Sequence, residues 1–183
     1  ADFTNVLKID PKFANAYGQR ASAYEEIGKD ELAIADYSKA IELDPGDITL
    51  FSNRAQAKLR VNDGVGAYQD ATAYLNRKGP KEDLGRYAVV VGYLGLRKTG
   101  RTLEATEFLR AWGKNTAPGT WIYQIYAFLD GRLTAEQLIR STGNTANLTE
   151  AHAYIGEVHI LNSEIETARF HFEWVRKNGN KKF

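Results

Sequence analysis

The hydrophobic pattern of residues 14–47 predicts two helices joined by a short turn. An apolar or small residue returns every three or four positions, which is the spacing of one helix face. The first face consists of Tyr17, Arg20, Ala21 and Tyr24, and the second of Ala33, Tyr37 and Ala40. Gly28-Lys29-Asp30 supplies the turn, and Pro45 ends the second helix because proline cannot continue one.

The same pattern returns once more along the chain. Residues 48–80 repeat it, and the step from Ala33 to Ala67 defines the length of one repeat. Residues 1–11 match the end of such a unit, so they predict the second helix of an incomplete first pair. Small residues at the repeated positions let paired helices approach closely. The first part of the chain is therefore predicted to be a tandem helical repeat.

Beyond Pro80 the period becomes irregular. A constant repeat length would place the next matching alanine at position 101, but it stands at Ala105, so a few residues are inserted near 77–83. Further helices are predicted at 82–98, 102–113, 119–129, 134–141, 148–161 and 164–177, with a polar loop at 142–147. The pattern predicts eleven helices and no strands. We expect an all-α superhelix (solenoid) of about five hairpins, the first incomplete, in a single domain over residues 1–183.

These spacings resemble the tetratricopeptide repeat family. The resemblance covers regular repeats in residues 1–76, divergent hairpins in 77–146 and a final hairpin in 148–177, where Ala168 and Phe172 restore the spacing. It implies a non-catalytic scaffold that binds a protein or peptide partner in its concave groove. The alternative is a structural module that self-associates through its C-terminal helices.

The second half also resembles the bacterial lipoprotein NlpI and its relatives. The resembling residues are Trp121, Ala127-Phe128-Leu129-Asp130-Gly131 and Tyr154-Ile155-Gly156-Glu157. That family is an envelope scaffold that forms dimers and brings proteases and peptidoglycan hydrolases together. The resemblance implies a bacterial envelope adaptor, a homodimer, and a periplasmic or envelope location rather than a cytoplasmic one.

Candidate groove residues lie on the first helix of each pair, which lines the concave side of stacked hairpins. Their solvent-facing positions follow the helical period. The candidates are Asn15, Gln19, Ser22, Glu26, Thr49, Asn53, Gln56, Arg60, Tyr87, Tyr123, Tyr126 and Tyr154. Amide and hydroxyl groups suit the backbone of an extended peptide because most of them both donate and accept hydrogen bonds. The alternatives are a solvated helix face for the polar residues and core packing for the tyrosines.

Some members of the family bind an acidic C-terminal peptide through Lys and Asn on successive first helices. Asn53 stands where one such asparagine would. Gly18 and Ser22 on the preceding helix, and Tyr87 and Val91 on the following one, do not match that pattern. We therefore expect no clamp for an acidic peptide terminus.

Arg20 and Arg54 occupy equivalent positions in the first two full units. They are candidates either for binding an acidic partner or for pairing with a carboxylate across their own hairpin. The net charge of +1 argues against a broad surface for nucleic acid.

The last predicted helix places apolar residues at an uncovered end of the array. These residues are Phe170, Phe172, Trp174 and Val175. A repeat array needs a polar capping helix at its end. We therefore expect either self-association at this face or a further helix downstream.

Nothing in the sequence indicates an enzyme, a cofactor or a metal site. His152 and His159 stand two helical turns apart, roughly 10 Å along a helix, too far to share an ion. His171 has no evident carboxylate partner, and the chain has no cysteine. The chain begins with Ala1 inside a repeat and contains no methionine, so we expect a fragment or a processed form.

Overall fold

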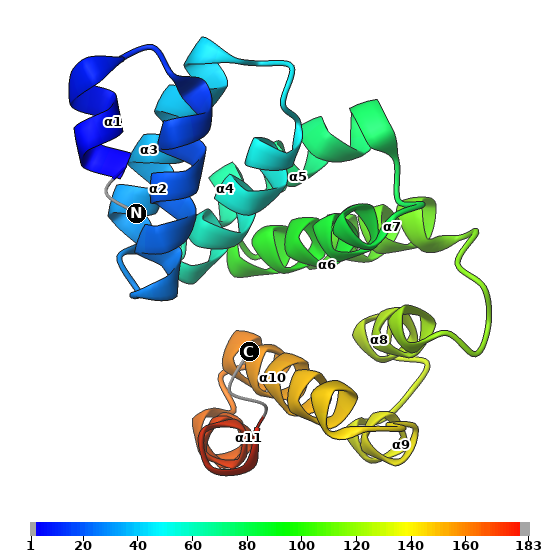
Figure 1. Ribbon diagram of the computed structural model, residues 1–183. Coiled ribbons are helices and arrows are strands. Elements are labelled where there is room, and N and C mark those ends of the chain that lie inside the picture. Colours follow the sequence, from blue (N-terminus) through cyan, green and yellow to red (C-terminus); the bar gives the residue numbers. More distant parts are fainter. Residues whose placement is uncertain (1–2, 180–183) are drawn as a thin grey trace. The chain divides into compact units, whose positions relative to one another are not determined.

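The computed structural model describes residues 3–179, and this part of the chain is all-α, with eleven helices and no strand (Figure 1). The helices are α1 (Phe3–Ile9), α2 (Ala14–Glu26), α3 (Asp30–Leu43), α4 (Thr49–Arg60), α5 (Gly64–Lys78), α6 (Asp83–Lys98), α7 (Thr102–Gly113), α8 (Trp121–Leu129), α9 (Ala135–Arg140), α10 (Thr145–Leu161) and α11 (Ile165–Asn178). The predicted fold class is confirmed.

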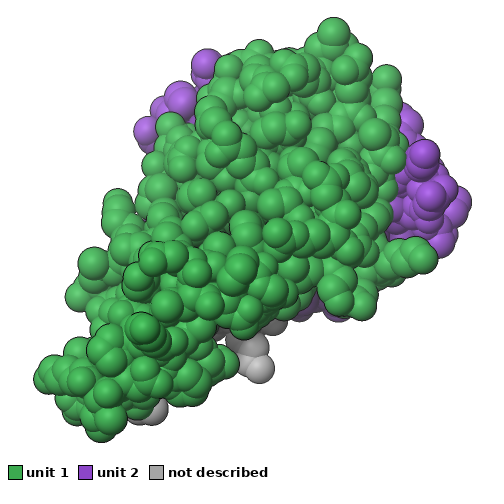
Figure 2. All heavy atoms as spheres, turned by 90° about the horizontal axis from the view of Figure 1, so that it is seen from above, with its two compact units in different colours: residues 1–112 green, residues 113–183 purple. Residues whose placement is uncertain are grey.

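The chain divides into two compact units, residues 1–112 and 113–183 (Figure 2). The first unit holds α1 to α6 and nearly all of α7, and the second holds α8 to α11. The single domain expected over residues 1–183 stays a prediction, and the two units are described separately.

In the first unit, consecutive helices from α1 to α6 pack against one another. The small residues of the repeat pattern are buried at the helix contacts, as their spacing predicts. They are Ala21, Ala33, Ala55 and Ala67. Gly28 and Asn62, which are separated by one repeat length, both adopt positive φ in the turns, with values of 68° and 65°. Glycine and asparagine are the residues that reach this backbone region most readily.

The contact between α5 and α6 is a close approach of two backbones. A Cβ atom built on Gly64 would lie 2.6 Å from the carbonyl oxygen of Gly95. A Cβ on Gly95 would lie 2.6 Å from the carbonyl oxygen of Gly64. Neither position has room for a side chain unless the backbone moves. Glycine at these two positions therefore sets the separation of α5 and α6.

In the second unit, a small apolar core joins α8, α9 and α10. Leu138, Ala151 and Ile155 are fully buried, with Trp121 and Phe128 packed against them. Helix α10 begins at Thr145, ahead of the predicted start at 148, so the predicted loop at 142–147 is too long. The Asn144 side chain accepts a hydrogen bond of 2.8 Å from the backbone N–H of Asn147 and caps the helix there.

Candidate functional site

A polar pocket of about 200 Å³ lies between α2, α4 and the loop that precedes α4. It is lined by Ala14, Asn15, Gly18, Gln19, Ser22, Asp44, Asp47, Thr49, Leu50 and Asn53. We call it the α2–α4 pocket. It brings together five of the predicted groove residues, namely Asn15, Gln19, Ser22, Thr49 and Asn53. The two helices are the first helices of consecutive repeats, which explains why the helical period selects these side chains.

Three side-chain amides in the α2–α4 pocket have no partner within the described chain. Asn15 and Gln19 on α2 are exposed, and Asn53 on α4 is half-buried. None of the three makes a side-chain hydrogen bond to another residue of the range 3–179. Each amide offers two donor hydrogens and an acceptor oxygen. The pocket therefore presents both donors and acceptors to whatever enters it.

Two carboxylates, from Asp44 and Asp47, also line the α2–α4 pocket. Oδ1 of Asp44 accepts from the backbone N–H of Gly46 at 3.0 Å. Oδ1 of Asp47 accepts from the backbone N–H of Thr49 at 3.0 Å and from its hydroxyl at 2.5 Å. These bonds fix both side chains with one oxygen each. No lysine, arginine or histidine is among the pocket residues.

The remaining polar groove candidates lie outside this pocket. Glu26 is exposed, and Gln56 is half-buried. Arg60 donates to Asp30 at 2.8 Å and to Glu25, so it ties α4 to α3 and α2. Glu25 also accepts from the hydroxyl of Tyr37, whose pKa is raised by burial and by this bond. Arg60 is thus engaged in the structure of the array rather than presented to a partner.

The tyrosine candidates do not form one aromatic surface. Tyr126 is 2% exposed, so the prediction that it lines a groove is corrected: it is a core residue of α8. Tyr123 is half-buried, accepts from Arg132 at 3.2 Å and lies beneath its guanidinium. Tyr87 and Tyr154 are half-buried on α6 and α10. The sequence pattern does not predict which tyrosines are buried, because α6 and α8 are apolar on more than one face.

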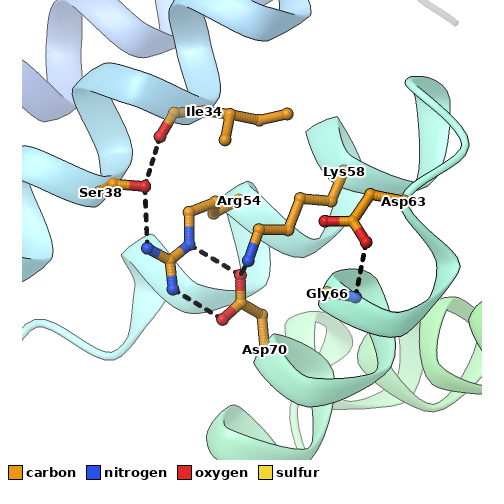
Figure 3. Close-up of polar contacts among 7 residues, drawn as sticks. All are labelled: Ile34, Ser38, Arg54, Lys58, Asp63, Gly66 and Asp70. Carbon is orange, nitrogen blue, oxygen red and sulfur yellow. Dashed lines mark hydrogen bonds and ion pairs between the residues drawn. The ribbon is translucent and has the colours of Figure 1, made fainter.

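A repeated network of polar side chains crosses the first unit. Arg54 on α4 donates two hydrogen bonds of 2.7 Å to Asp70 on α5, and Lys58 contacts the same carboxylate at 2.8 Å (Figure 3). Arg54 also donates at 2.9 Å to the hydroxyl of Ser38, which in turn donates to the carbonyl oxygen of Ile34 at 2.6 Å. The guanidinium therefore connects three consecutive helices.

The same network occurs one repeat earlier. Arg20 donates to Asp36 at 2.6 and 2.8 Å and to the hydroxyl of Thr4 at 3.5 Å. The hydrogen bond to Asp36 raises the pKa of the guanidinium above its ordinary value, against the effect of burial. Of the two alternatives for Arg20 and Arg54, the structure shows pairing with a carboxylate across the hairpin.

The network stops one repeat later. Thr72 occupies the position equivalent to Ser38. Once the insertion near 77–83 is counted, however, the position equivalent to Arg54 is Gly92, and that equivalent to Asp70 is Phe108. The hydroxyl of Thr72 is buried and has no hydrogen-bond partner in the described residues. The close contact of Gly64 with Gly95 joins the same two helices, α5 and α6, between which the network is missing. A polar connection between helices is thus replaced by direct backbone contact where the repeat becomes irregular.

The C-terminal hairpin exposes apolar side chains. Phe170 is 62% exposed, and Ile165 and Ile160 are also exposed. An open pocket of about 330 Å³, which we call the α10–α11 pocket, is lined by Ile160, Ile165, Arg169, Phe172, Glu173 and Arg176. Trp174 and Val175 are only half-buried, but Trp174 stacks on the His152 ring at 4.0 Å. Phe170 is therefore the most available of the predicted contact residues, and Phe172 is half-buried against Gly156 of α10.

Three histidines come together between α10 and α11. Nδ1 of His152 lies 2.9 Å from Nδ1 of His171, and the rings of His159 and His171 are 5.6 Å apart. His159 also contacts Glu164 at 2.5 Å. Burial lowers the pKa of His152, and burial with the neighbouring His152 and His159 lowers the pKa of His171 to about 4. The spacing within one helix does not predict this cluster, because it depends on how α11 packs.

The described residues contain no group of three or more His, Asp or Glu side chains arranged to hold a metal ion. None of the helices within residues 3–179 combines the length and the apolar character that crossing a membrane requires.

The geometry defines a class of protein: an array of helical hairpins with polar side chains on its first helices. A family model described as "Tetratricopeptide repeat" matches residues 14–47. Residues 14–47 therefore form a tetratricopeptide repeat, and the chain has the fold of tetratricopeptide-repeat proteins.

Solved structures agree with this fold. A tetratricopeptide repeat protein from Parabacteroides merdae is 21% identical, with a TM-score of 0.65, over 98% of this chain and 71% of that one. The structure of MamA is 16% identical, with a TM-score of 0.57, over 96% of this chain and 87% of that one. At these identities the similarity shows the fold alone.

Curated relatives match only short stretches. Serine/threonine-protein phosphatase T from Trypanosoma brucei brucei is 41% identical over 59 residues, 32% of this chain and 11% of that protein. A protein SGT1 homolog from Oryza sativa subsp. japonica is 34% identical over 73 residues, 40% of this chain and 19% of that protein. The chain thus matches less than a fifth of the length of either relative.

Proposed function

We propose that this protein is a non-catalytic scaffold that binds an extended segment of a partner protein in the α2–α4 pocket. Tetratricopeptide repeats commonly mediate contacts between proteins, and repeat arrays use their concave surfaces for them. The observation that carries the proposal is the set of three amides without partners in the described chain, Asn15, Gln19 and Asn53, in one pocket. An extended peptide has unpaired backbone N–H and C=O groups, which these amides match.

The test compares the wild-type protein with a Gln19→Ala, Asn53→Ala variant. Peptides are first selected on the wild type from a synthetic library of acetylated nonapeptides. We expect the variant to bind them at least about tenfold more weakly, because two neutral hydrogen bonds contribute about 1 kcal/mol each. Titration calorimetry measures both affinities. A Gln69→Ala variant, on the surface of α5 and outside the pocket, is the matched control and should bind as the wild type does.

Two results would contradict this proposal. The library yields no peptide that the wild type retains, or the selected peptides bind the double variant as tightly as the wild type. Circular dichroism confirms that the double variant is folded, which is expected because neither side chain bonds to the rest of the described chain.

Within this class we propose a bacterial envelope adaptor that acts in the periplasm. The support is the resemblance of residues in the second half, among them Trp121 and Tyr154-Ile155-Gly156-Glu157, to NlpI and its relatives. Fractionation of the source cells tests the location. Recovery of the protein with the cytoplasmic fraction would contradict it.

A second candidate function, self-association of two copies through α10 and α11, is supported by the exposed apolar side chains there. We expect a concentration-dependent dimer in light scattering after size exclusion, and a Phe170→Ser, Ile165→Ser variant that stays monomeric. Leu103→Ser on α7 is the control, since Leu103 is at least as exposed but lies in the other unit. A wild type that is monomeric at all concentrations would refute this candidate.

A further inference from the structure

We propose that the α2–α4 pocket takes the cationic head of a lysine or arginine side chain on the bound peptide. This inference rests on the proposed function, because it names the chemistry that the same pocket selects. It depends on the charges of the pocket, on the groups that are already paired, and on the apolar part of its lining.

The pocket is lined by two exposed carboxylates and by no cationic side chain. Asp44 and Asp47 each use Oδ1 in bonds to the loop that they cap. Within residues 3–179, neither carboxylate forms an ion pair, and no hydrogen bond reaches either Oδ2. Two carboxylates that share a small concave space favour a cation there.

The arginines on α2, α4 and α5 do not make the lining of the pocket positive. Arg20 is bound to Asp36, and Arg54 is bound to Asp70, so each repeat neutralises its own buried charges between its two helices. Arg77 on α5 donates to the carbonyl oxygen of Pro45 at 3.0 Å, so one exposed cation lies close to the loop that carries the two carboxylates. None of these three arginines is among the residues that line the pocket. Within the lining of the pocket, an acidic side chain would therefore meet two like charges and no cationic residue, which is the opposite of a carboxylate clamp.

The remaining lining suits a long cationic side chain better than a small free ion. The carbonyl oxygens of the Asn15, Gln19 and Asn53 amides can accept hydrogen bonds from an ammonium or guanidinium group. Leu50 and Ala14 offer apolar surface for the methylene stem that lysine and arginine bury. The pocket volume of about 200 Å³ accommodates such a side chain but not a folded element.

The experiment removes the negative charge of the two pocket aspartates and keeps the size of their side chains. In Asp44→Asn and Asp47→Asn, a side-chain oxygen can still accept the backbone bonds of the loop, so the turns are retained while the negative charge is removed. Asp10→Asn is the matched control: Oδ1 of Asp10 accepts from the backbone N–H of Lys12 at 3.0 Å in the equivalent turn one repeat earlier, and Asp10 does not line the pocket.

The acetylated nonapeptide library is selected in parallel on the wild type, the Asp44→Asn, Asp47→Asn variant and the Asp10→Asn control. We expect lysine or arginine at one fixed position in the peptides from the wild type and the control, and no such enrichment with the pocket variant. Replacing that lysine by norleucine should weaken binding to the wild type about tenfold at low salt and much less in about 1 M salt, where charges are screened within about 3 Å.

The outcomes separate this inference from the function on which it rests. Peptides that lose affinity in the Gln19→Ala, Asn53→Ala variant but show no cationic position overturn the inference and leave the proposed function standing. Absence of any selected peptide overturns both. Equal affinity of the lysine and norleucine peptides also overturns the inference. A free amino terminus as the true cation would appear as tighter binding of non-acetylated peptides that lack lysine and arginine, and it would overturn the assignment to a side chain.

Discussion

Asp70→Ala is expected to lower the free energy of unfolding by about 3 kcal/mol, because removing one partner of a buried ion pair leaves the other charge uncompensated. Asp70 is 5% exposed and binds both Arg54 and Lys58. Its loss leaves two cations without a counter-charge at the contact of α4 and α5. Urea denaturation followed by circular dichroism measures the change, and hydrogen exchange should show it in α4 and α5.

The control for this prediction is Glu42→Ala. Glu42 pairs with Lys39 at 2.8 Å on the surface of α3, with both side chains exposed. Exposed pairs of this kind contribute about 0–1 kcal/mol. If Asp70→Ala and Glu42→Ala destabilise the protein equally, the network shown in Figure 3 is not a main stabilising feature of the repeats.

The second prediction is a loss of stability of the α10–α11 hairpin as the pH falls from about 6.5 to about 4. The pKa values of His152 and His171 are lowered by burial, so the folded state holds both rings neutral. Below pH 6.5 the unfolded chain takes up protons that the folded state refuses, and stability declines until the folded His171 itself titrates near pH 4. Above pH 6.5 the contribution is fully present.

The expected loss is about 2–3 kcal/mol, since one unit of pKa shift corresponds to about 1.4 kcal/mol. The charged and titratable groups that face the pair are His159, stacked on His171, and Glu164, which contacts His159. Hydrogen exchange at several pH values measures the opening of α10 and α11 and compares it with α2 and α3. A His152→Leu, His171→Leu variant should show a flatter profile over this range. An identical profile in this variant would show that other groups cause the acid sensitivity.

Much of the first unit follows from the repeat period. The period places small residues at helix contacts and arginines at equivalent positions, and a carboxylate follows each arginine at the same offset, at Asp36 and Asp70. The helical period alone does not identify those aspartates as partners, although their repetition at one offset is a usable signal. The sequence also shows where the network ends, since Gly92 stands at the position of the expected arginine while Thr72 keeps the hydroxyl.

The rest depends on packing that no single helix specifies. The pairing of His152 with His171 requires the register of α11 against α10, and periodicity within either helix does not contain it. The helical period assigns Tyr126 to a surface because its helix is apolar on several faces, and only its 2% exposure places it in the core. The helical period does not identify Asp44 and Asp47 as groove residues, because they lie in the turn between α3 and α4, where that period does not apply.

The proposed function depends on the α2–α4 pocket being the surface that binds the partner. Its most direct test is the affinity of wild-type-selected peptides for the Gln19→Ala, Asn53→Ala variant. We expect the variant to bind them at least about tenfold more weakly than the wild type does, since two of the three amides without partners in the described chain are gone. Equal affinity of the variant and the wild type would show that the peptides bind elsewhere on the protein and that the α2–α4 pocket is not the binding surface.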